Sequence, residues 1–149
     1  MNEKTVKYWN EFWQEKVAPT NVSAEQFGFE YTPLADELAQ SIIDGKKTAT
    51  CPAHLFYELE NEPLPEVGDY TIVLSSKDEP LAIIRNTDIQ LIPMNEVSLE
   101  FAIAEAGSYE YWWESHVKFF TAELAEYGKK FSEEMLLVWI WFEVIDVKK

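Results

Sequence analysis

Residues 41–50 read SIIDGKKTAT, and this stretch joins an expected helix to a short run of alternating residues. Upstream, a Thr-Pro pair at 32–33 forms a helix start, and apolar residues recur every four positions from Leu34 to Ile42. Gly45 supplies the helix stop. The pattern therefore predicts a helix over about 33–44 that delivers the chain directly to two lysines.

Those lysines, Lys46 and Lys47, are the only basic residues between Lys16 and Lys77. A partly desolvated lysine can bind a phosphate or carboxylate group, or act as a base. Two solvated lysines after a helix C-terminus are the plainer interpretation, because cations are favourable there. Both interpretations stay open at this stage.

Thr48 and Thr50 alternate with Ala49, so in a strand their side chains would share one face. Lys46 would join that face if the strand began early enough, and Lys47 would then point elsewhere. A threonine hydroxyl can act as a nucleophile when a neighbouring base removes its proton. Two β-forming residues in an ordinary strand are the alternative, and the sequence does not decide which lysine faces a site.

Short apolar segments separated by turn signals predict five or six strands, including 55–59, 70–74, 81–84, 89–92 and 135–145. Helices are expected over 4–16, 98–106 and 109–127, the last between a Ser108 cap and a Gly128 stop. Residues 17–31 show no sustained period and read as a connecting segment. This order predicts one α+β domain over 1–149, a small barrel with flanking helices and an appended N-terminal helix.

The 149 residues include 12 basic and 27 acidic side chains, a formal charge of −15. A broad basic surface for nucleic acid is therefore excluded, and any RNA contact is expected to be local. The single cysteine suits a reducing cytoplasm. Charges interrupt the N-terminal segment, and the longest apolar run, 135–142, is far shorter than the ~20 residues of a membrane helix, so neither secretion nor a membrane partner is expected.

Three further residues are candidates for a site. His116 lies on the aromatic face of the expected helix 109–127, either as a satisfied core residue or as a ligand-binding one. Glu105 ends the expected helix 98–106, where its carboxylate could be buried beside a pocket or remain solvated. Cys51 reads as a small buried residue. No cysteine, histidine or carboxylate set stands at metal-ligand spacing, so neither a metal nor another cofactor is expected.

Several motifs, in this order along the chain, resemble the ASCH domain (activating signal cointegrator homology), a relative of PUA domains. The first is the junction 41–50, followed by Val67-Gly68-Asp69 before an expected strand. The remaining motifs are similar to a bacterial ASCH subfamily with an extra N-terminal helix: Tyr8-Trp9, Phe12-Trp13, Glu110-Tyr111-Trp112, His116, Phe119-Phe120 and Phe131-Ser132-Glu133. The resemblance covers essentially the whole chain.

The resemblance implies a PUA-like β-barrel with a ligand cleft beside the Gly-Lys-Lys-Thr turn. Small bacterial ASCH proteins include amidohydrolases that remove the acetyl group from acetylated cytidine, using a lysine and a threonine of this turn with a downstream glutamate. At the matching positions these residues are Lys47, Thr50 and Glu105. Lys47 would activate the Thr50 hydroxyl or polarise the substrate, and Glu105 would accept or relay a proton. The expected ligand-binding residues are Gly45, Lys46, Thr48 and His116.

The chain departs from the family pattern in two places. Cys51-Pro52 stands where many ASCH turns continue with an arginine, and the stretch 106–110 also lacks the arginine expected in close relatives. Both departures remove contacts to an RNA backbone and favour a small nucleoside-like ligand. The alternative is an RNA-binding or RNA-processing module, since other ASCH proteins are reported to cut RNA. A third hypothesis is homo-oligomerisation through the aromatic N-terminal helix, whose tryptophans would otherwise pack on their own domain.

Overall fold

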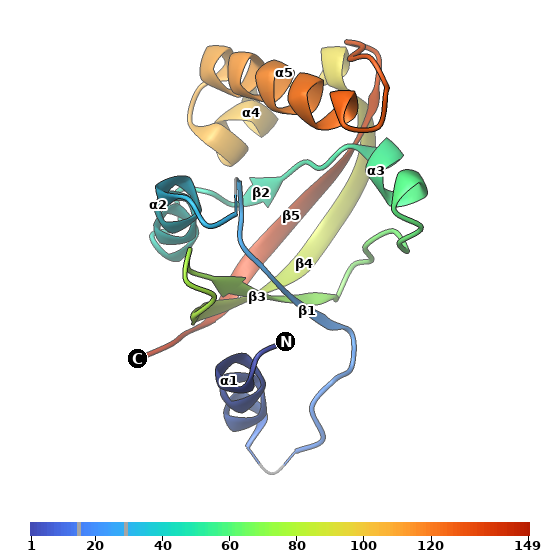
Figure 1. Ribbon diagram of the computed structural model, residues 1–149. Helices are drawn as coiled ribbons and strands as arrows, with labels where there is room; N and C mark the ends of the chain where they lie inside the picture. The colour runs from blue at the N-terminus through green and yellow to red at the C-terminus, as the bar shows by residue number, and fades with distance from the viewer. Residues whose placement is uncertain (15, 29) are drawn as a thin grey trace. The chain divides into compact units, whose positions relative to one another are not determined.

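The computed structural model describes residues 1–14, 16–28 and 30–149 of the chain (Figure 1). Residues 15 and 29, which fall within the expected ranges 4–16 and 17–31, lie outside the described residues. The elements follow in the order α1 (Glu3–Trp13), β1 (Val22–Glu25), α2 (Pro33–Ile43), β2 (Ala49–Thr50), α3 (His54–Leu59), β3 (Tyr70–Leu74), β4 (Pro80–Pro93), a 3-10 helix (Met94–Glu96), α4 (Leu99–Ala106), α5 (Tyr109–Ala125) and β5 (Leu136–Val147).

The strands form one mixed sheet in the order β1-β3-β4-β5-β2. β1 pairs parallel with β3, whereas β3 pairs antiparallel with β4 and β2 pairs antiparallel with β5. Strands and helices together confirm the predicted α+β class. Since β1 and β2 are the two ends of the strand order, hydrogen bonding does not close the sheet into a complete barrel.

Contacts within the chain group it into two compact units. Unit 1 comprises residues 1–46, 66–87 and 142–149, and unit 2 comprises residues 47–65 and 88–141. β4 and β5 contribute residues to both units. The expectation of a single domain over 1–149 stays a prediction.

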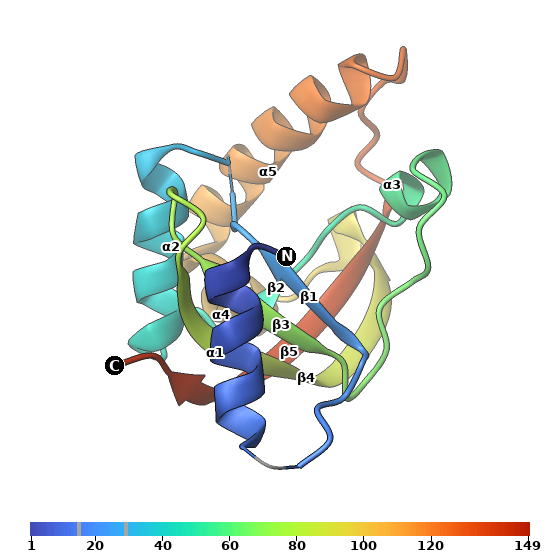
Figure 2. The same ribbon diagram turned by 60° about the horizontal axis from the view of Figure 1, so that its bottom comes forward.

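In unit 1, α1 lies against the strands of the same unit (Figure 2). Its aromatic side chains pack on residues of those strands. The Asn2 side chain caps the helix by accepting a hydrogen bond from the Thr5 backbone N–H. Trp9 is buried, 4% exposed, in a cluster that includes Ile72 of β3 and Ile83 of β4. The tryptophans of the predicted amphipathic helix therefore find apolar contacts within their own unit.

Three sequence expectations are corrected by the structure, the first being the strand expected at 55–59, which is the helix α3. Phe56 is buried, and Leu55 and Leu59 pack against the same cluster. Residues three and four positions apart share a helix face, whereas 55 and 56 would point to opposite faces of a strand. The short apolar run did not distinguish these two cases.

The other two corrections concern strand boundaries. The expected strands 81–84 and 89–92 are one continuous strand, β4, because the polar residues between them stay within the ladder. Asn86 is buried there, its backbone N–H bonds to the Asp69 carbonyl, and its side chain donates to the Glu66 carbonyl. The segment expected to connect elements over 17–31 contains β1, whose four residues are too few to establish a period.

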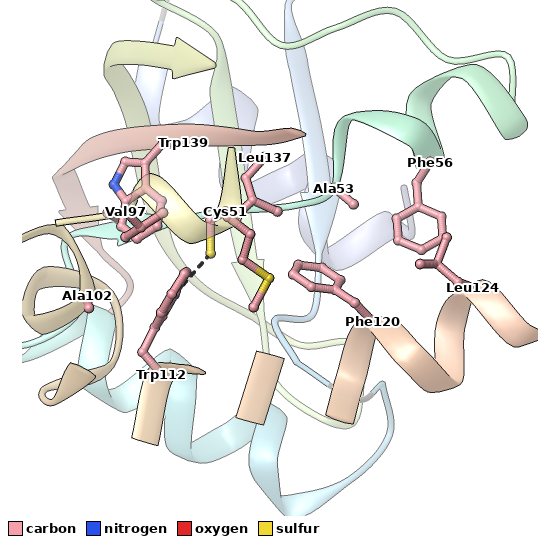
Figure 3. Close-up of a cluster of buried hydrophobic side chains, with 12 residues drawn as sticks. Cys51, Ala53, Phe56, Val97, Ala102, Trp112, Phe120, Leu124, Leu137 and Trp139 are labelled. Atoms are coloured by element: carbon pink, nitrogen blue, oxygen red, sulfur yellow. Dashed lines mark hydrogen bonds between the residues drawn. The ribbon is translucent and has the colours of Figure 1, made fainter. Parts of the chain in front are cut away.

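The core of unit 2 is an aromatic cluster that joins β5, α4 and α5 (Figure 3). Trp112, Phe120 and Trp139 are essentially inaccessible to solvent. Ser98 and Ser108 cap the N-termini of α4 and α5, and each serine side chain accepts a hydrogen bond from a backbone N–H of its helix. The sequence predicted the cap at Ser108. These caps and this core fix the helices that carry the candidate site.

One acid of α5 makes the stability of unit 2 depend on pH. Burial, with Glu60 and Glu126 nearby, raises the pKa of Glu123 from 4.5 to about 7. Its buried Oε2 has no hydrogen-bond partner in the described part of the chain. The folded state therefore holds this proton more tightly than the unfolded chain, and stability is lost as pH rises from about 4.5 to about 7.

We expect Glu123→Gln to raise the melting temperature at pH 8 and to leave it nearly unchanged at pH 4, where the carboxyl is already neutral. Thermal unfolding followed by circular dichroism at the two pH values measures this difference. Glu114→Gln, an exposed position on the same helix, is the control and should show no such pH dependence. An equal change in melting temperature at both pH values for the Glu123 variant would contradict the raised pKa of Glu123.

Candidate functional site

The burial of residues 47–51 alternates along the chain. Lys47, Ala49 and Cys51 are buried, whereas Thr48 and Thr50 are only half-buried. Lys47 is 4% exposed, which is rare for a lysine. Lys46 is exposed. The structure thus assigns the buried position to the second lysine of the turn, whereas the two threonines are half-buried.

The Lys47 ammonium group is fully engaged by unit 2. Its Nζ lies 2.5 Å from Glu105 Oε1 and 2.7 Å from the Ala49 carbonyl oxygen, to which it donates. A third, longer contact of 3.4 Å reaches the Glu105 backbone carbonyl. An ammonium group has three N–H donors, so all three have an acceptor. The contact at 3.4 Å is the one most readily given up to a ligand.

Glu105 reaches Lys47 because the end of α4 is tied to the start of β2. The Thr48 backbone N–H donates to the Ala104 carbonyl at 2.9 Å, and the Thr48 hydroxyl lies 3.5 Å from the same oxygen. Gly107, with φ of +85°, ends the helix in the left-handed conformation that glycine permits. The Glu105 side chain is 9% exposed, so its carboxylate is a buried partner of a buried lysine.

His116 lies on the other side of the Glu105 carboxylate. Its ring stacks on Trp112, with centroids 5.2 Å apart, and contacts Phe120 at 5.6 Å. Nδ1 lies 2.7 Å from the Trp112 carbonyl oxygen, which can only accept, so Nδ1 carries a hydrogen. Burial lowers the pKa of His116, against a smaller opposing effect of Glu105. In the neutral ring, Nε2 therefore presents a lone pair.

That lone pair faces the second oxygen of Glu105. Nε2 lies 3.3 Å from Glu105 Oε2, within ion-pair distance. Oε2 is nevertheless buried without a hydrogen-bond partner. The two observations agree if both atoms are acceptors, because the contact becomes a hydrogen bond only when a proton lies on one of them.

Cys51 completes the cluster. It is buried, and the Trp112 Nε1–H donates to its Sγ at 3.4 Å (Figure 3). Burial, reinforced by the charge of Glu105, raises the pKa of the Cys51 thiol. One ligand atom each of Cys51, Glu105 and His116 lies within 4.8 Å of the others. Spacing along the chain does not reveal this group of donors, because the fold assembles it from three separate segments, and the absence of a metal stays an expectation.

The remaining expected site residues make no hydrogen bond or ion pair with Lys47, Glu105 or His116 among the described residues. Thr50 pairs with Ile140 in the ladder of β2 and β5, and its hydroxyl has no hydrogen-bond partner among the described residues. Gly45, with φ of +76°, and the exposed Lys46 belong to unit 1. The structure therefore brings Lys47, Glu105 and His116 together and records no bond between Lys47 and the Thr50 hydroxyl.

A surface pocket of about 420 Å³ belongs to unit 1 and gathers four of the 12 basic residues, Lys4, Lys7, Lys148 and Lys149. Lys4 lies 3.5 Å from Glu79, and Lys7 lies 3.8 Å from Glu11, so two of these charges are partly neutralised. The sequence pattern does not reveal this cluster, because its members come from opposite ends of the chain. The pocket holds none of the expected site residues.

The mixed sheet and its helices define an α+β protein, and the pair of Lys47 and Glu105 lies within unit 2. The family model of the ASCH domain matches residues 23–146, and the chain belongs to that family. The helix α1 precedes the matched region, as expected for the subfamily with an extra N-terminal helix.

Solved structures extend this likeness. A protein from Enterococcus faecalis V583 is 39% identical, with a TM-score of 0.89 over 99% of this chain and 91% of that chain. An ASCH domain from Lactobacillus crispatus JV V101 is 31% identical, with a TM-score of 0.87 over 97% of this chain and 95% of that chain. A mutant ASCH protein from Zymomonas mobilis, 12% identical with a TM-score of 0.51 over 86% of this chain and 73% of that chain, shares the fold alone. The search of curated proteins found no match.

No helix within residues 1–14, 16–28 and 30–149 is both long enough and apolar enough to cross a bilayer.

Proposed function

We propose that this protein is a small amidohydrolase that removes the acyl group from an acylated, modified nucleoside, with Lys47, Glu105 and Thr50 as its catalytic residues. The observation that carries the proposal is the buried contact between Lys47 and Glu105. A buried ion pair adds little stability compared with apolar side chains of similar volume. Charges retained in such a position indicate a chemical role, and the matching family positions support the same one.

The contacts of the pair suggest how the work is divided. The Lys47 ammonium can release its 3.4 Å contact with the Glu105 carbonyl and donate to the acyl oxygen of the substrate, stabilising the charge that develops there. Glu105 can accept the proton of the attacking water and return it to the nitrogen that leaves. His116, 3.3 Å from Oε2, lies where it can share that proton.

Thr50 fits a substrate contact better than activation by Lys47. Thr50 is half-buried in β2, Lys47 precedes that strand, and the Thr50 hydroxyl has no hydrogen-bond partner among the described residues. A half-buried hydroxyl without a partner can bind a polar group of a ligand. Thr48, which is also half-buried, is a further expected ligand contact in unit 2.

The charge of the chain favours a small ligand over RNA. The net charge of −15 repels a phosphate backbone, and Cys51-Pro52 stands where many family members have an arginine. An uncharged acylated nucleoside avoids this repulsion. RNA binding that weakens with salt would instead favour the RNA-processing alternative.

The test is hydrolysis of a panel of acylated nucleosides, followed by chromatography. We expect the wild type to release the free nucleoside and Thr50→Val to reduce kcat/KM by about 10- to 100-fold, the loss of one hydrogen bond to the substrate. Thr87→Val, an exposed strand threonine of β4, is the control and should retain full activity. Wild-type protein that is folded and turns over no member of the panel would contradict the amidohydrolase.

A further inference from the structure

We infer that Cys51, Glu105 and His116 form a binding site for one thiophilic divalent cation such as Zn²⁺, and that Lys47 competes with the cation for Glu105. Nothing in the reaction proposed above requires this cation. Bound to Glu105 Oε2, it would draw the carboxylate away from proton transfer, so the site would be inhibitory. The inhibition rests on the proposed function, whereas the binding does not.

The donor atoms are of the types that Zn²⁺ binds, and two of them stand at the spacing of zinc ligands. A thiolate, an imidazole nitrogen and a carboxylate oxygen are its usual protein ligands, and three protein ligands with a water complete a tetrahedral site. With Zn–N and Zn–O bonds of about 2.0–2.1 Å, two such ligands stand about 3.3–3.4 Å apart. His116 Nε2 and Glu105 Oε2 are 3.3 Å apart, and Cys51 Sγ lies within 4.8 Å of one ligand atom of each of these two residues.

The surroundings orient two of these atoms as ligands. The Trp112 carbonyl takes the Nδ1 hydrogen of His116, which is the arrangement that directs the lone pair of Nε2 toward a metal. Glu105 Oε2 is buried and has no hydrogen-bond partner among the described residues, although Oε1 of the same carboxylate is held by Lys47. A carboxylate oxygen buried without a donor has the most to gain from a cation.

The charges indicate a site of limited affinity that Lys47 controls. A Cys51 thiolate and the Glu105 carboxylate together neutralise a divalent cation, but the buried Lys47 ammonium adds a positive charge beside it. Binding also releases the thiol proton, so affinity should rise with pH. The His116 side chain is 18% exposed, which leaves one edge of the cluster in contact with solvent.

The experiment is a Co²⁺ titration of the full chain, prepared without a metal-binding tag and followed by absorption. We expect one Co²⁺ per chain and a thiolate-to-cobalt charge-transfer band, which excess Zn²⁺ abolishes. Cys51 is the only cysteine, so the band has a single source. It should disappear in Cys51→Ser and weaken in His116→Gln, whereas His54→Gln, at the other histidine of the chain, should leave it unchanged.

Removing the competing charge should have the opposite effect. Lys47→Met is expected to bind Co²⁺ about tenfold more tightly or better, because a neighbouring positive charge is lost. Lys118→Met, at an exposed lysine of α5, removes the same charge away from the cluster and should change the affinity little. If Lys47→Met does not fold, the comparison of wild type with Cys51→Ser still decides the proposal.

Two results would overturn the site: folded wild-type protein without the band, or equal Co²⁺ affinity in wild type and Cys51→Ser. Neither depends on a substrate. A protein with the band but without turnover would defeat only the hydrolase, and one with turnover but without the band would defeat only the cation site. If both proposals hold, Zn²⁺ inhibits the wild type and spares Cys51→Ser.

Discussion

Replacing Lys47 with methionine is expected to lower the free energy of unfolding by about 3–5 kcal/mol. The substitution keeps the length of the side chain and removes its charge, which leaves the Glu105 carboxylate buried without the ammonium that lies 2.5 Å from it. The Ala49 carbonyl loses its donor as well. Urea unfolding followed by circular dichroism and by tryptophan fluorescence measures the loss.

A double variant separates the charge from the packing. Lys47→Met combined with Glu105→Gln should regain most of the stability, because neutral groups of similar volume often replace a buried ion pair without cost. Lys118→Met is the matched control for an exposed lysine and should change the unfolding free energy by less than about 0.5 kcal/mol. A loss below about 1 kcal/mol in the single variant would contradict the stabilising role of the ion pair.

The second large effect is expected at Trp112, where alanine should cost about 3–5 kcal/mol. The indole is fully buried, donates to Cys51 at 3.4 Å and lies 5.8 Å from the ring of Trp139 and 5.2 Å from that of His116. Its removal opens a cavity in the centre of unit 2 and releases the histidine ring from its stacking partner.

The neighbouring tryptophan provides the comparison. Trp113 is only partly buried against the same cluster, so Trp113→Ala should cost clearly less when both variants are unfolded in urea. Trp112→Phe should fall between them, because it keeps a ring and loses the N–H donor to Cys51. Equal losses for Trp112→Ala and Trp113→Ala would contradict the central position assigned to Trp112.

The elements that could be predicted are those whose signals lie within a few residues. The Pro33 start and Gly45 stop located α2, the Ser108 cap located α5, and the run 70–74 matches β3 residue for residue. β1 and α3 were missed because each depends on a partner distant in sequence. β1 exists through its parallel pairing with β3, and α3 through the burial of Phe56 in the core of unit 2.

The candidate site divides in the same way. The sequence of the turn predicted a lysine in the site but left open whether it is Lys46 or Lys47. The alternating burial of residues 47–51, which tertiary packing sets, shows that Lys47 is the buried one. Glu105 and His116 were each recognised as candidates, yet their contact and the approach of Cys51 require α4 and α5 to pack together. The spacing of these residues along the chain does not predict that they contact one another in the fold.

The burial of Cys51 beneath Trp112 also makes the thiol a built-in reporter. The side chain is 3% exposed, and its environment opposes thiolate formation, so alkylating reagents will react only when this part of the chain opens. Because the chain has no second cysteine, the labelling rate then follows one event: the separation of the indole from the sulfur. Alkylation of the native cysteine, followed by mass spectrometry, therefore measures how fast the core opens transiently, without any engineered probe.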